Sequence, residues 1–154
     1  MNSLGICVIF SCCLFVLTQA AWEKAHIREA ISKCNATEKD ADVLLTKFSA
    51  PDTPSGKCLM LCVLKFYNMI DSLGKYDEAA GLARLRERWT EIDDAEVVAA
   101  NSNCVAFGKT IPDASACEYG YQIMKCLIQE VTNGKFYEKS MKKLAEKKEA
   151  TTSN

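Results

Sequence analysis

Cysteine is the residue type whose number and spacing in this chain could do specific chemistry. The sequence holds nine cysteines, and three of them fall within the first 20 residues. The remaining six are Cys34, Cys58, Cys62, Cys104, Cys117 and Cys126. An even number of cysteines in a small secreted chain indicates a framework of disulfide bridges, and six cysteines allow 15 pairings. The chemistry expected of these residues is therefore cross-linking in an oxidising compartment.

The first 20 residues have the pattern of a secretory signal peptide. An uninterrupted run of apolar and small residues extends from Leu4 to Leu17, and Thr18-Gln19-Ala20 follows it. Such a run fits a signal-peptide core of about 7 to 15 residues, whereas a membrane-spanning helix needs about 20. We expect cleavage after Ala20 and secretion of residues 21–154, which form a single domain. No later segment is apolar over a length that would span a bilayer.

Helical geometry excludes two of the bridges. Cys58 and Cys62 are at positions i and i+4 of a helical stretch, where Cβ atoms lie about 5 to 6 Å apart, and a disulfide requires about 3.8 Å. Cys117 and Cys126 lie on opposite faces of another helix, with about 13 Å of axial rise between them. Without these two bridges, ten of the 15 pairings remain open.

Other chemistry finds little support in the residue types. The cysteine spacings differ from the ligand pairs of zinc ribbons and fingers, and His26 is the only histidine. A histidine-based triad or a hydrolytic zinc site would depend on that residue, which falls on the polar side of the first apolar stripe. We therefore predict no enzymatic activity, no metal and no cofactor. The 19 basic and 20 acidic side chains nearly cancel, which argues against nucleic acid as a partner.

The elements that hold the cysteines are predicted to be helices. Apolar residues recur at helical spacing, and no segment alternates with the period of a half-buried strand. Pro51, Pro54 and Gly56 are expected to end the second helix, and Asn133-Gly134 the sixth. The first of six expected helices carries an apolar stripe of Ile27, Ala30, Ile31 and Cys34, and the second is capped by Thr37, with Asp40 three residues on. The third covers about 57–71, and the fourth contains Leu82, Leu85 and Trp89. The fifth contains Val97, Ala100, Cys104 and Phe107, and the sixth covers 114–131.

A Lys-rich segment, residues 135–154, follows the sixth helix. Its apolar residues, Phe136, Tyr137, Met141 and Leu144, would give a seventh helix only a narrow apolar stripe. The segment ends in a polar tail. Its charges favour a solvated helix.

The spacing of the six cysteines resembles that of the insect odorant- and pheromone-binding proteins. Successive cysteines are separated by 23, 3, 41, 12 and 8 residues, and the three and the eight are fixed spacings of that family. The resemblance covers the mature chain up to Cys126. It implies the bridges Cys34–Cys62, Cys58–Cys117 and Cys104–Cys126, and an all-α fold of about six helices enclosing an apolar cavity.

The third and the sixth expected helices each have an apolar flank that would face such a cavity. In the sixth helix, Glu118, Gln122, Lys125 and Gln129 occupy the opposite, polar flank. Apolar stripes of this kind are more often ordinary core, and the resemblance is what favours a ligand site. Tyr67, Tyr119 and Trp89 are candidates to orient a ligand or, equally, amphipathic residues at the core margin. The expected ligand-binding residues are Leu59, Val63, Phe66, Tyr67, Ile70, Trp89, Phe107, Tyr119, Gly120, Ile123, Met124 and Leu127.

Gly120 has two interpretations. Glycine inside a helix costs about 1 kcal/mol relative to alanine, so its position on the apolar flank needs a reason. Space for a ligand is one reason, and close packing of two helices is the other.

The resemblance implies a secreted carrier that binds small hydrophobic molecules and transports them through aqueous fluid. Odorants, pheromones and other apolar lipids are the expected ligands, and a membrane receptor is a further candidate partner. The chain is expected to be a monomer or a weak homodimer. The alternative is a secreted protein of the same fold outside olfaction, which scavenges lipids or binds other proteins through the Lys-rich segment.

Overall fold

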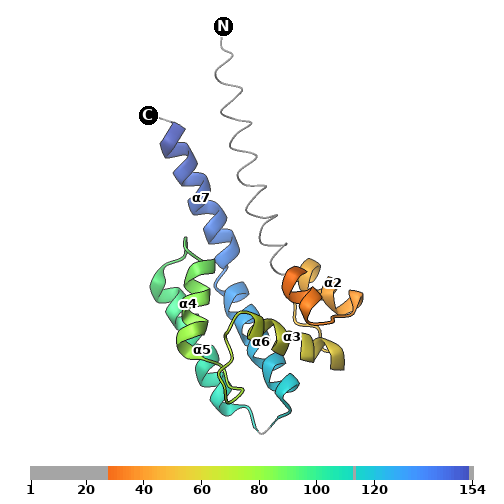
Figure 1. Ribbon diagram of the computed structural model, residues 1–154. Coiled ribbons are helices and arrows are strands. Elements are labelled where there is room, and N and C mark those ends of the chain that lie inside the picture. Colours follow the sequence, from red (N-terminus) through yellow and green to blue (C-terminus); the bar gives the residue numbers. More distant parts are fainter. Residues whose placement is uncertain (1–27, 113, 153–154) are drawn as a thin grey trace.

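The computed structural model describes residues 28–112 and 114–152, and in these ranges the chain is built from helices (Figure 1). The expected signal peptide, His26 and Ile27 lie outside the described residues. The only strand-like pairing in the described ranges is an isolated antiparallel bridge between Ile70 and Tyr76. Residues 28–33 are helical, and they are followed by α2 (Glu38–Lys47), α3 (Pro54–Phe66), α4 (Glu78–Arg88), α5 (Asp94–Thr110), α6 (Ala116–Asn133) and α7 (Phe136–Thr152). The all-α prediction is confirmed.

Each helix from α2 to α6 begins after a residue whose side chain accepts a hydrogen bond from a backbone N–H of the first turn. Such caps satisfy donors that have no partner inside the helix. The cap predicted at Thr37 is confirmed, because its hydroxyl accepts from the Asp40 N–H. The capping residues are Thr37, Thr53, Asp77, Asp93 and Ser115.

The boundaries of the third and sixth helices differ from the sequence prediction. Pro54 begins α3 instead of ending the previous helix, because proline fits the first position of a helix and Thr53 caps it. The third helix ends at Phe66 instead of near residue 71, because Asn68 takes a left-handed conformation with φ of 56°. The sixth helix is shifted by two residues and ends at Asn133, before the expected Gly134. The Lys-rich segment forms a seventh helix.

Three disulfides join the helices, and they are the three that the family resemblance implied. Cys34–Cys62 ties the end of the first helix to α3, Cys58–Cys117 ties α3 to α6, and Cys104–Cys126 ties α5 to α6. The helix α6 is therefore cross-linked near its start to α3 and in its second half to α5.

Gly120 lies where α3 and α6 come closest. A Cβ atom at this position would be 2.6 Å from both Cα and Cβ of Leu61, well inside ordinary carbon–carbon contact. The space beside Gly120 is therefore filled by the backbone of α3. This geometry corrects the placement of Gly120 on a ligand cavity and agrees with close packing of two helices.

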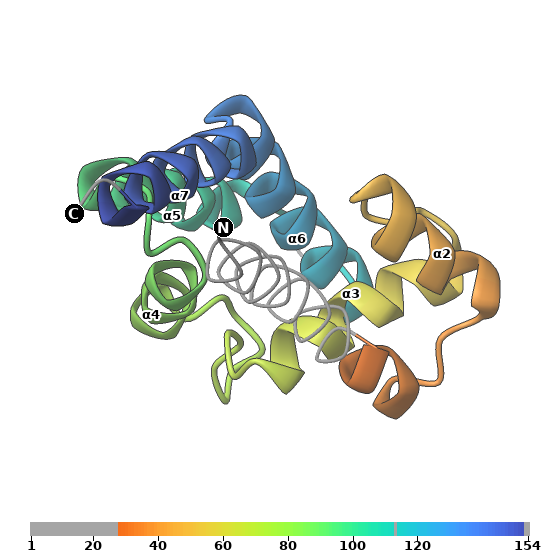
Figure 2. The ribbon, with the colours of Figure 1, turned by 90° about the horizontal axis from the view of Figure 1, so that it is seen from above.

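The apolar interior consists of two clusters of buried side chains. The larger, here called the α4–α6 cluster, is formed mainly by α4, α5 and α6 and includes Trp89, Val97, Cys104, Ile123 and Leu127. The smaller, here called the α2–α3 cluster, contains Ala30, Ile31, Leu44, Leu59, Met60, Val63 and Tyr121. Seen from above, α3, α4, α5 and α6 are arranged around the middle of the molecule, and α2 lies to one side (Figure 2).

Asp40 is a buried charge that joins the starts of α2 and α3. Its carboxylate accepts hydrogen bonds from the hydroxyls of Thr37 (2.7 Å), Thr53 (2.7 Å) and Ser55 (2.6 Å). These bonds, led by that from Ser55, hold the pKa of Asp40 below its usual value, although burial alone would raise it. The capping residues of two helices are thus positioned by one carboxylate.

The helix α7 is attached to the bundle mainly at its first residue and by ion pairs. Phe136 is buried with its ring edge-on to Trp89, at 5.7 Å between centroids. Lys139 pairs with Glu96, and Lys147 pairs with Glu91 at 2.7 Å. The rest of the expected apolar stripe is more open, since Tyr137 is 65% exposed and Met141 43%. In Figure 1, α7 extends beyond the other helices. None of the described helices is long and apolar enough to cross a membrane.

Candidate ligand-binding site

The expected ligand-binding residues fall into three groups by burial. Leu59 and Val63 are core residues of the α2–α3 cluster. Phe107 of α5 is 40% exposed. The residues buried in the α4–α6 cluster are Trp89, Tyr119, Ile123 and Leu127, and those only partly buried are Phe66, Tyr67, Ile70 and Met124.

Tyr67 and Met124 lie at the junction between the two clusters. Both side chains pack against the α2–α3 cluster and against the α4–α6 cluster, and both stay partly exposed. Tyr67 is the C-cap of α3, and Met124 belongs to the apolar flank of α6 that the sequence predicted. Leu82 of α4 is also only partly buried against the α4–α6 cluster. An apolar molecule bound at this junction would be in contact with both halves of the interior.

Two cations lie on an aromatic pair at the end of α3. The rings of Phe66 and Tyr67 meet edge to face, with centroids 5.1 Å apart. The Lys33 ammonium lies 5.2 Å from the centre of the Phe66 ring, and the Arg84 guanidinium carbon lies 4.3 Å from the centre of the Tyr67 ring. Cations at these distances from a ring face are attracted by its negative potential. The partly exposed edge of the junction thus carries two basic side chains, each of which also pairs with an acid, Lys33 with Glu29 and Arg84 with Glu87.

Tyr119 has a hydrogen-bonding role inside the fold. Its hydroxyl accepts from the backbone N–H of Tyr76 at 3.1 Å, in a buried position. Tyr76 in turn donates its own hydroxyl to the side-chain oxygen of Asn101 at 2.8 Å, and burial raises the pKa of this phenol. These bonds fasten the loop between α3 and α4 to α5 and α6. One acceptor position of the Tyr119 hydroxyl is therefore used by the fold.

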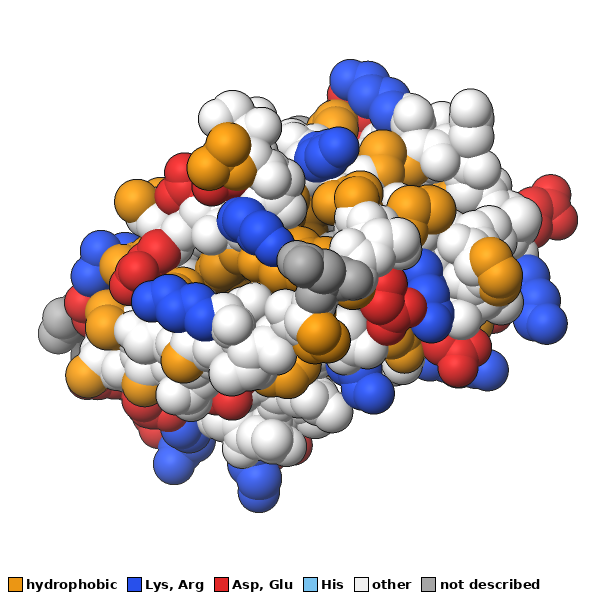
Figure 3. Space-filling view, turned by 90° about the horizontal axis from the view of Figure 1, so that it is seen from below, with side chains coloured by type: hydrophobic (Ala, Val, Ile, Leu, Met, Phe, Trp, Pro, Cys, Tyr) orange, Lys and Arg blue, Asp and Glu red, His pale blue; other side chains and the backbone are white. Residues whose placement is uncertain are grey.

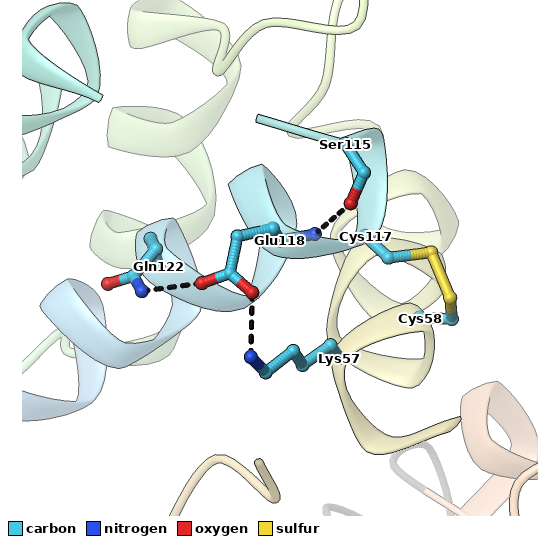
Figure 4. Close-up of polar contacts among 6 residues, drawn as sticks. All are labelled: Lys57, Cys58, Ser115, Cys117, Glu118 and Gln122. Carbon is cyan, nitrogen blue, oxygen red and sulfur yellow. Dashed lines mark hydrogen bonds and ion pairs between the residues drawn. A yellow bond between two sulfur atoms is a disulfide. The ribbon is translucent and has the colours of Figure 1, made fainter. Parts of the chain in front are cut away.

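A polar bridge crosses the start of α3 and α6. Lys57 Nζ donates to one carboxylate oxygen of Glu118 at 2.7 Å, and Gln122 Nε2 donates to the other at 2.7 Å (Figure 4). The hydrogen bond from Lys57, followed by that from Gln122, lowers the pKa of Glu118, and the same contact raises the pKa of Lys57. The bridge lies next to the Cys58–Cys117 disulfide and reinforces that cross-link.

Open hollows flank this bridge on both sides. One, of about 270 Å³, is lined by apolar side chains that include Phe107 and Ile111 and by the polar Glu118 and Gln122. The other, of about 400 Å³, is lined by Lys57, the Cys58–Cys117 pair and residues near them. Figure 3 views the molecule from below and shows hydrophobic side chains in a hollow near the middle of this face. Because both hollows are open and share a charged wall at Glu118, they suit a hydrocarbon chain poorly.

The structure also brings residues to the junction that sequence reasoning did not select. Arg84 and Lys33 were not singled out, because charged residues on amphipathic helices are normally solvated. Leu82, an apolar residue expected on the fourth helix, packs partly buried against the α4–α6 cluster alone. The described residues contain no cluster of three or more histidine, cysteine or acidic side chains placed to hold a metal ion.

Comparison with known proteins agrees with the fold and the cysteine pattern. The model of the PBP/GOBP family matches residues 17–130. The structure is similar to an odorant-binding protein of Drosophila melanogaster, dmelOBP28a, with a TM-score of 0.60, 25% identity, and coverage of 77% of this chain and 98% of that one. It is also similar to the fatty acid binding protein OBP56a from the oral disk of the blowfly Phormia regina, with a TM-score of 0.53 and 27% identity, over 75% of this chain and 94% of that one. No curated protein sequence matches the chain. Since the family model spans well over half of the sequence, the chain belongs to the PBP/GOBP family, and its fold is that of the insect odorant-binding proteins.

Proposed function

We propose that the protein is a secreted carrier of small hydrophobic molecules, which it binds at the junction of the two apolar clusters. The observation that carries this proposal is the partial exposure of Tyr67 and Met124, each packed against both clusters. Apolar surface removed from water contributes about 25 cal/mol per Å². A ligand that covers these side chains would therefore bind through burial alone, without a chemical step.

Membership of a family of binding proteins supports this proposal, and so does the similarity to a fatty acid binding protein of the blowfly. The three disulfides suit a carrier because they hold α3, α5 and α6 together when no ligand contributes to packing. A native disulfide typically contributes about 2 to 4 kcal/mol to folding stability. The protein should then stay folded between ligand release and the next binding event.

The C-terminal helix gives less support to the alternative of a protein-binding surface. Lys139 and Lys147 form ion pairs with Glu96 and Glu91 of the same chain. These contacts direct part of the positive charge of the Lys-rich segment toward the bundle. The carrier is therefore the function that we retain.

Displacement of a fluorescent apolar probe, N-phenyl-1-naphthylamine, tests the proposal. Alcohols, esters and fatty acids of increasing chain length should displace the probe, and Met124→Trp should weaken binding by filling the junction. Met141→Trp on the exposed part of α7 is the matched control and should bind as the wild type does. Equal effects of the two substitutions, or no displacement by any apolar compound, would contradict the carrier function.

Secretion is tested separately. Expression of the full chain in a secretory host should yield protein in the medium whose first residue is Ala21. Retention of the protein in the cell, or a mature chain that still contains residues 1–20, would contradict this part of the proposal.

A further inference from the structure

Arg84 has an edge of its guanidinium group that no acceptor among the described residues occupies. Its Nη1 donates to Glu87 at 2.6 Å, and its guanidinium carbon lies over the Tyr67 ring. The side chain is 28% exposed, so the group is more enclosed than a typical surface arginine. Nε and Nη2 remain as donors, and together they form the planar fork that matches a carboxylate.

Arg86, two residues further along α4, shows how this protein fills such a fork. Its Nε donates to one carboxylate oxygen of Asp94 at 2.6 Å, and its Nη2 donates to the other at 2.8 Å. The pair is bidentate and joins α4 to α5. Arg84 lies on the same helix and has the same two donors, Nε and Nη2. In the described part of the chain, no carboxylate accepts a hydrogen bond from them.

The surroundings of Arg84 connect this open fork to the candidate site. Tyr67, under the guanidinium group, is one of the two side chains that border both apolar clusters. Lys33 places a second positive charge over the neighbouring Phe66 ring. The nearby acids act on other atoms, since Glu87 contacts Arg84 at Nη1 and Glu29 pairs with Lys33 at 2.9 Å. A molecule at the junction would have its apolar part among hydrophobic side chains and one end beside a cationic edge.

We propose that the Nε–Nη2 edge of Arg84 binds the carboxylate of an amphiphilic ligand whose hydrocarbon chain lies against Tyr67 and Met124. The inference rests on the proposed carrier function and adds the ligand class: a long-chain carboxylic acid is bound in preference to the alcohol of equal length. Arginine is suited to this task because it stays charged, stacks on an aromatic ring and presents two parallel donors. Lys33 adds a weaker, non-directional attraction for the same negative end.

The size of the preference follows from what the alcohol lacks. An alcohol can accept one neutral hydrogen bond from Arg84, whereas a carboxylate accepts two charge-assisted bonds. Hydrogen bonds to charged groups contribute more than neutral ones, and the partial exposure of Arg84 reduces the difference. We expect about tenfold tighter binding of the acid, and loss of most of this preference in Arg84→Gln.

The test compares dodecanoic acid with dodecan-1-ol, by titration calorimetry at neutral pH, on the full chain expressed in a secretory host. Arg84→Gln should weaken binding of the acid about tenfold and leave that of the alcohol unchanged. Arg84→Lys should retain part of the preference, because it keeps the charge but not the fork. Arg86→Gln is the matched control on the same helix, and its acid-to-alcohol ratio should equal that of the wild type.

Three results would overturn the inference. Equal losses for acid and alcohol in Arg84→Gln would show that Arg84 only supports the packing of Tyr67. Unchanged affinities for both ligands in Arg84→Gln, or the same loss in Arg86→Gln, would show that the carboxylate binds elsewhere or through overall charge. If the alcohol binds and the ratio is unaffected, the carrier function stands without this inference. If neither ligand binds to the wild type, the carrier function fails as well.

Discussion

Replacing Gly120 by alanine adds one methyl group where α3 and α6 are in closest contact. The new Cβ atom would lie 2.6 Å from Cα and Cβ of Leu61 and 3.0 Å from its backbone nitrogen. Carbon atoms in ordinary contact are about 3.5 to 4.0 Å apart. Since two of the three atoms belong to the backbone, no change of a side-chain rotamer relieves the overlap. The two helices must separate, and the Cys58–Cys117 bridge resists that movement.

The expected change in stability is the difference between two effects. Overpacking of a well-packed contact typically costs about 1 to 3 kcal/mol. Alanine gains about 1 kcal/mol of helix propensity over glycine. The backbone overlap puts the cost near the upper end of its range, so the net loss should be about 1 to 2 kcal/mol. For a domain of this size, such a loss lowers the thermal midpoint by about 4 to 8 °C.

The assay is thermal unfolding without ligand, followed by affinities for a chain-length series of alcohols. Gly108→Ala is the matched control, because its Cβ would meet only side-chain ends, those of Ile123 at 3.0 Å and Tyr119 at 3.1 Å. Its midpoint should change by less than that of Gly120→Ala. Adding Leu61→Ala to Gly120→Ala should not restore stability, because the clashing backbone atoms remain. An unchanged midpoint combined with weaker binding of long ligands would refute this reasoning and return Gly120 to the ligand site.

Three other changes should have defined effects. Asp40→Asn should destabilise the fold by about 2 to 3 kcal/mol at neutral pH, because it disturbs three hydrogen bonds to a buried carboxylate. The pKa of Asp40 is lower in the folded protein than its usual value of 3.8. The carboxylate therefore stabilises the fold above pH 3.8, and this stabilisation is lost as the pH falls further. Urea unfolding at pH 7 and at pH 3 should show the loss. Limited reduction followed by alkylation and mass spectrometry should find the Cys58–Cys117 bridge opened first, since Cys58 is exposed. Tyr76→Phe should cost about 1 to 3 kcal/mol in urea unfolding, because the buried amide oxygen of its partner on α5 loses its donor.

Each of these predictions has a control or a contradicting result. Asp42→Asn on the exposed side of α2 should leave stability nearly unchanged, and an equal loss there would remove the special role of Asp40. Early reduction of the Cys104 bridge, whose Cys104 is fully buried, would contradict the ranking by exposure. Tyr137→Phe on α7 is the control for Tyr76→Phe, because Tyr137 is exposed.

The sequence was most informative where local chemistry determines local structure. The cap at Thr37 and the end of α6 before Gly134 follow from the residues at those positions. The separation of α6 into a polar and an apolar flank follows from its 3.6-residue period, and the structure buries Ile123 and exposes Gln129 accordingly. The disulfide pairing came from the family resemblance, because helix geometry alone left ten pairings open.

The candidate site was less predictable because it depends on where helices end and meet. A third helix continued to residue 71 would have placed Tyr67 and Ile70 on one stripe, whereas the left-handed turn at Asn68 leaves Tyr67 as the C-cap of α3 and places Ile70 in the loop beyond it. Tyr67 also contacts Arg84, a residue 17 positions away on α4, and no local sequence pattern encodes this contact. Gly120 was ambiguous for the same reason, since only the position of Leu61 on another helix decides between ligand space and helix packing.

The central claim is that an apolar ligand binds where the two clusters meet, and methionine methyl NMR tests it most directly. Of the five methionines, Met124 lies at this junction, Met60 and Met69 are buried in separate clusters, and Met141 is on the exposed part of α7. With ¹³C-methyl methionine and dodecan-1-ol, we expect the Met124 signal to shift the most and to show cross-peaks to the ligand, while Met141 is unaffected. An unmoved Met124 signal at saturating ligand, or cross-peaks from Met141 instead, would contradict the account.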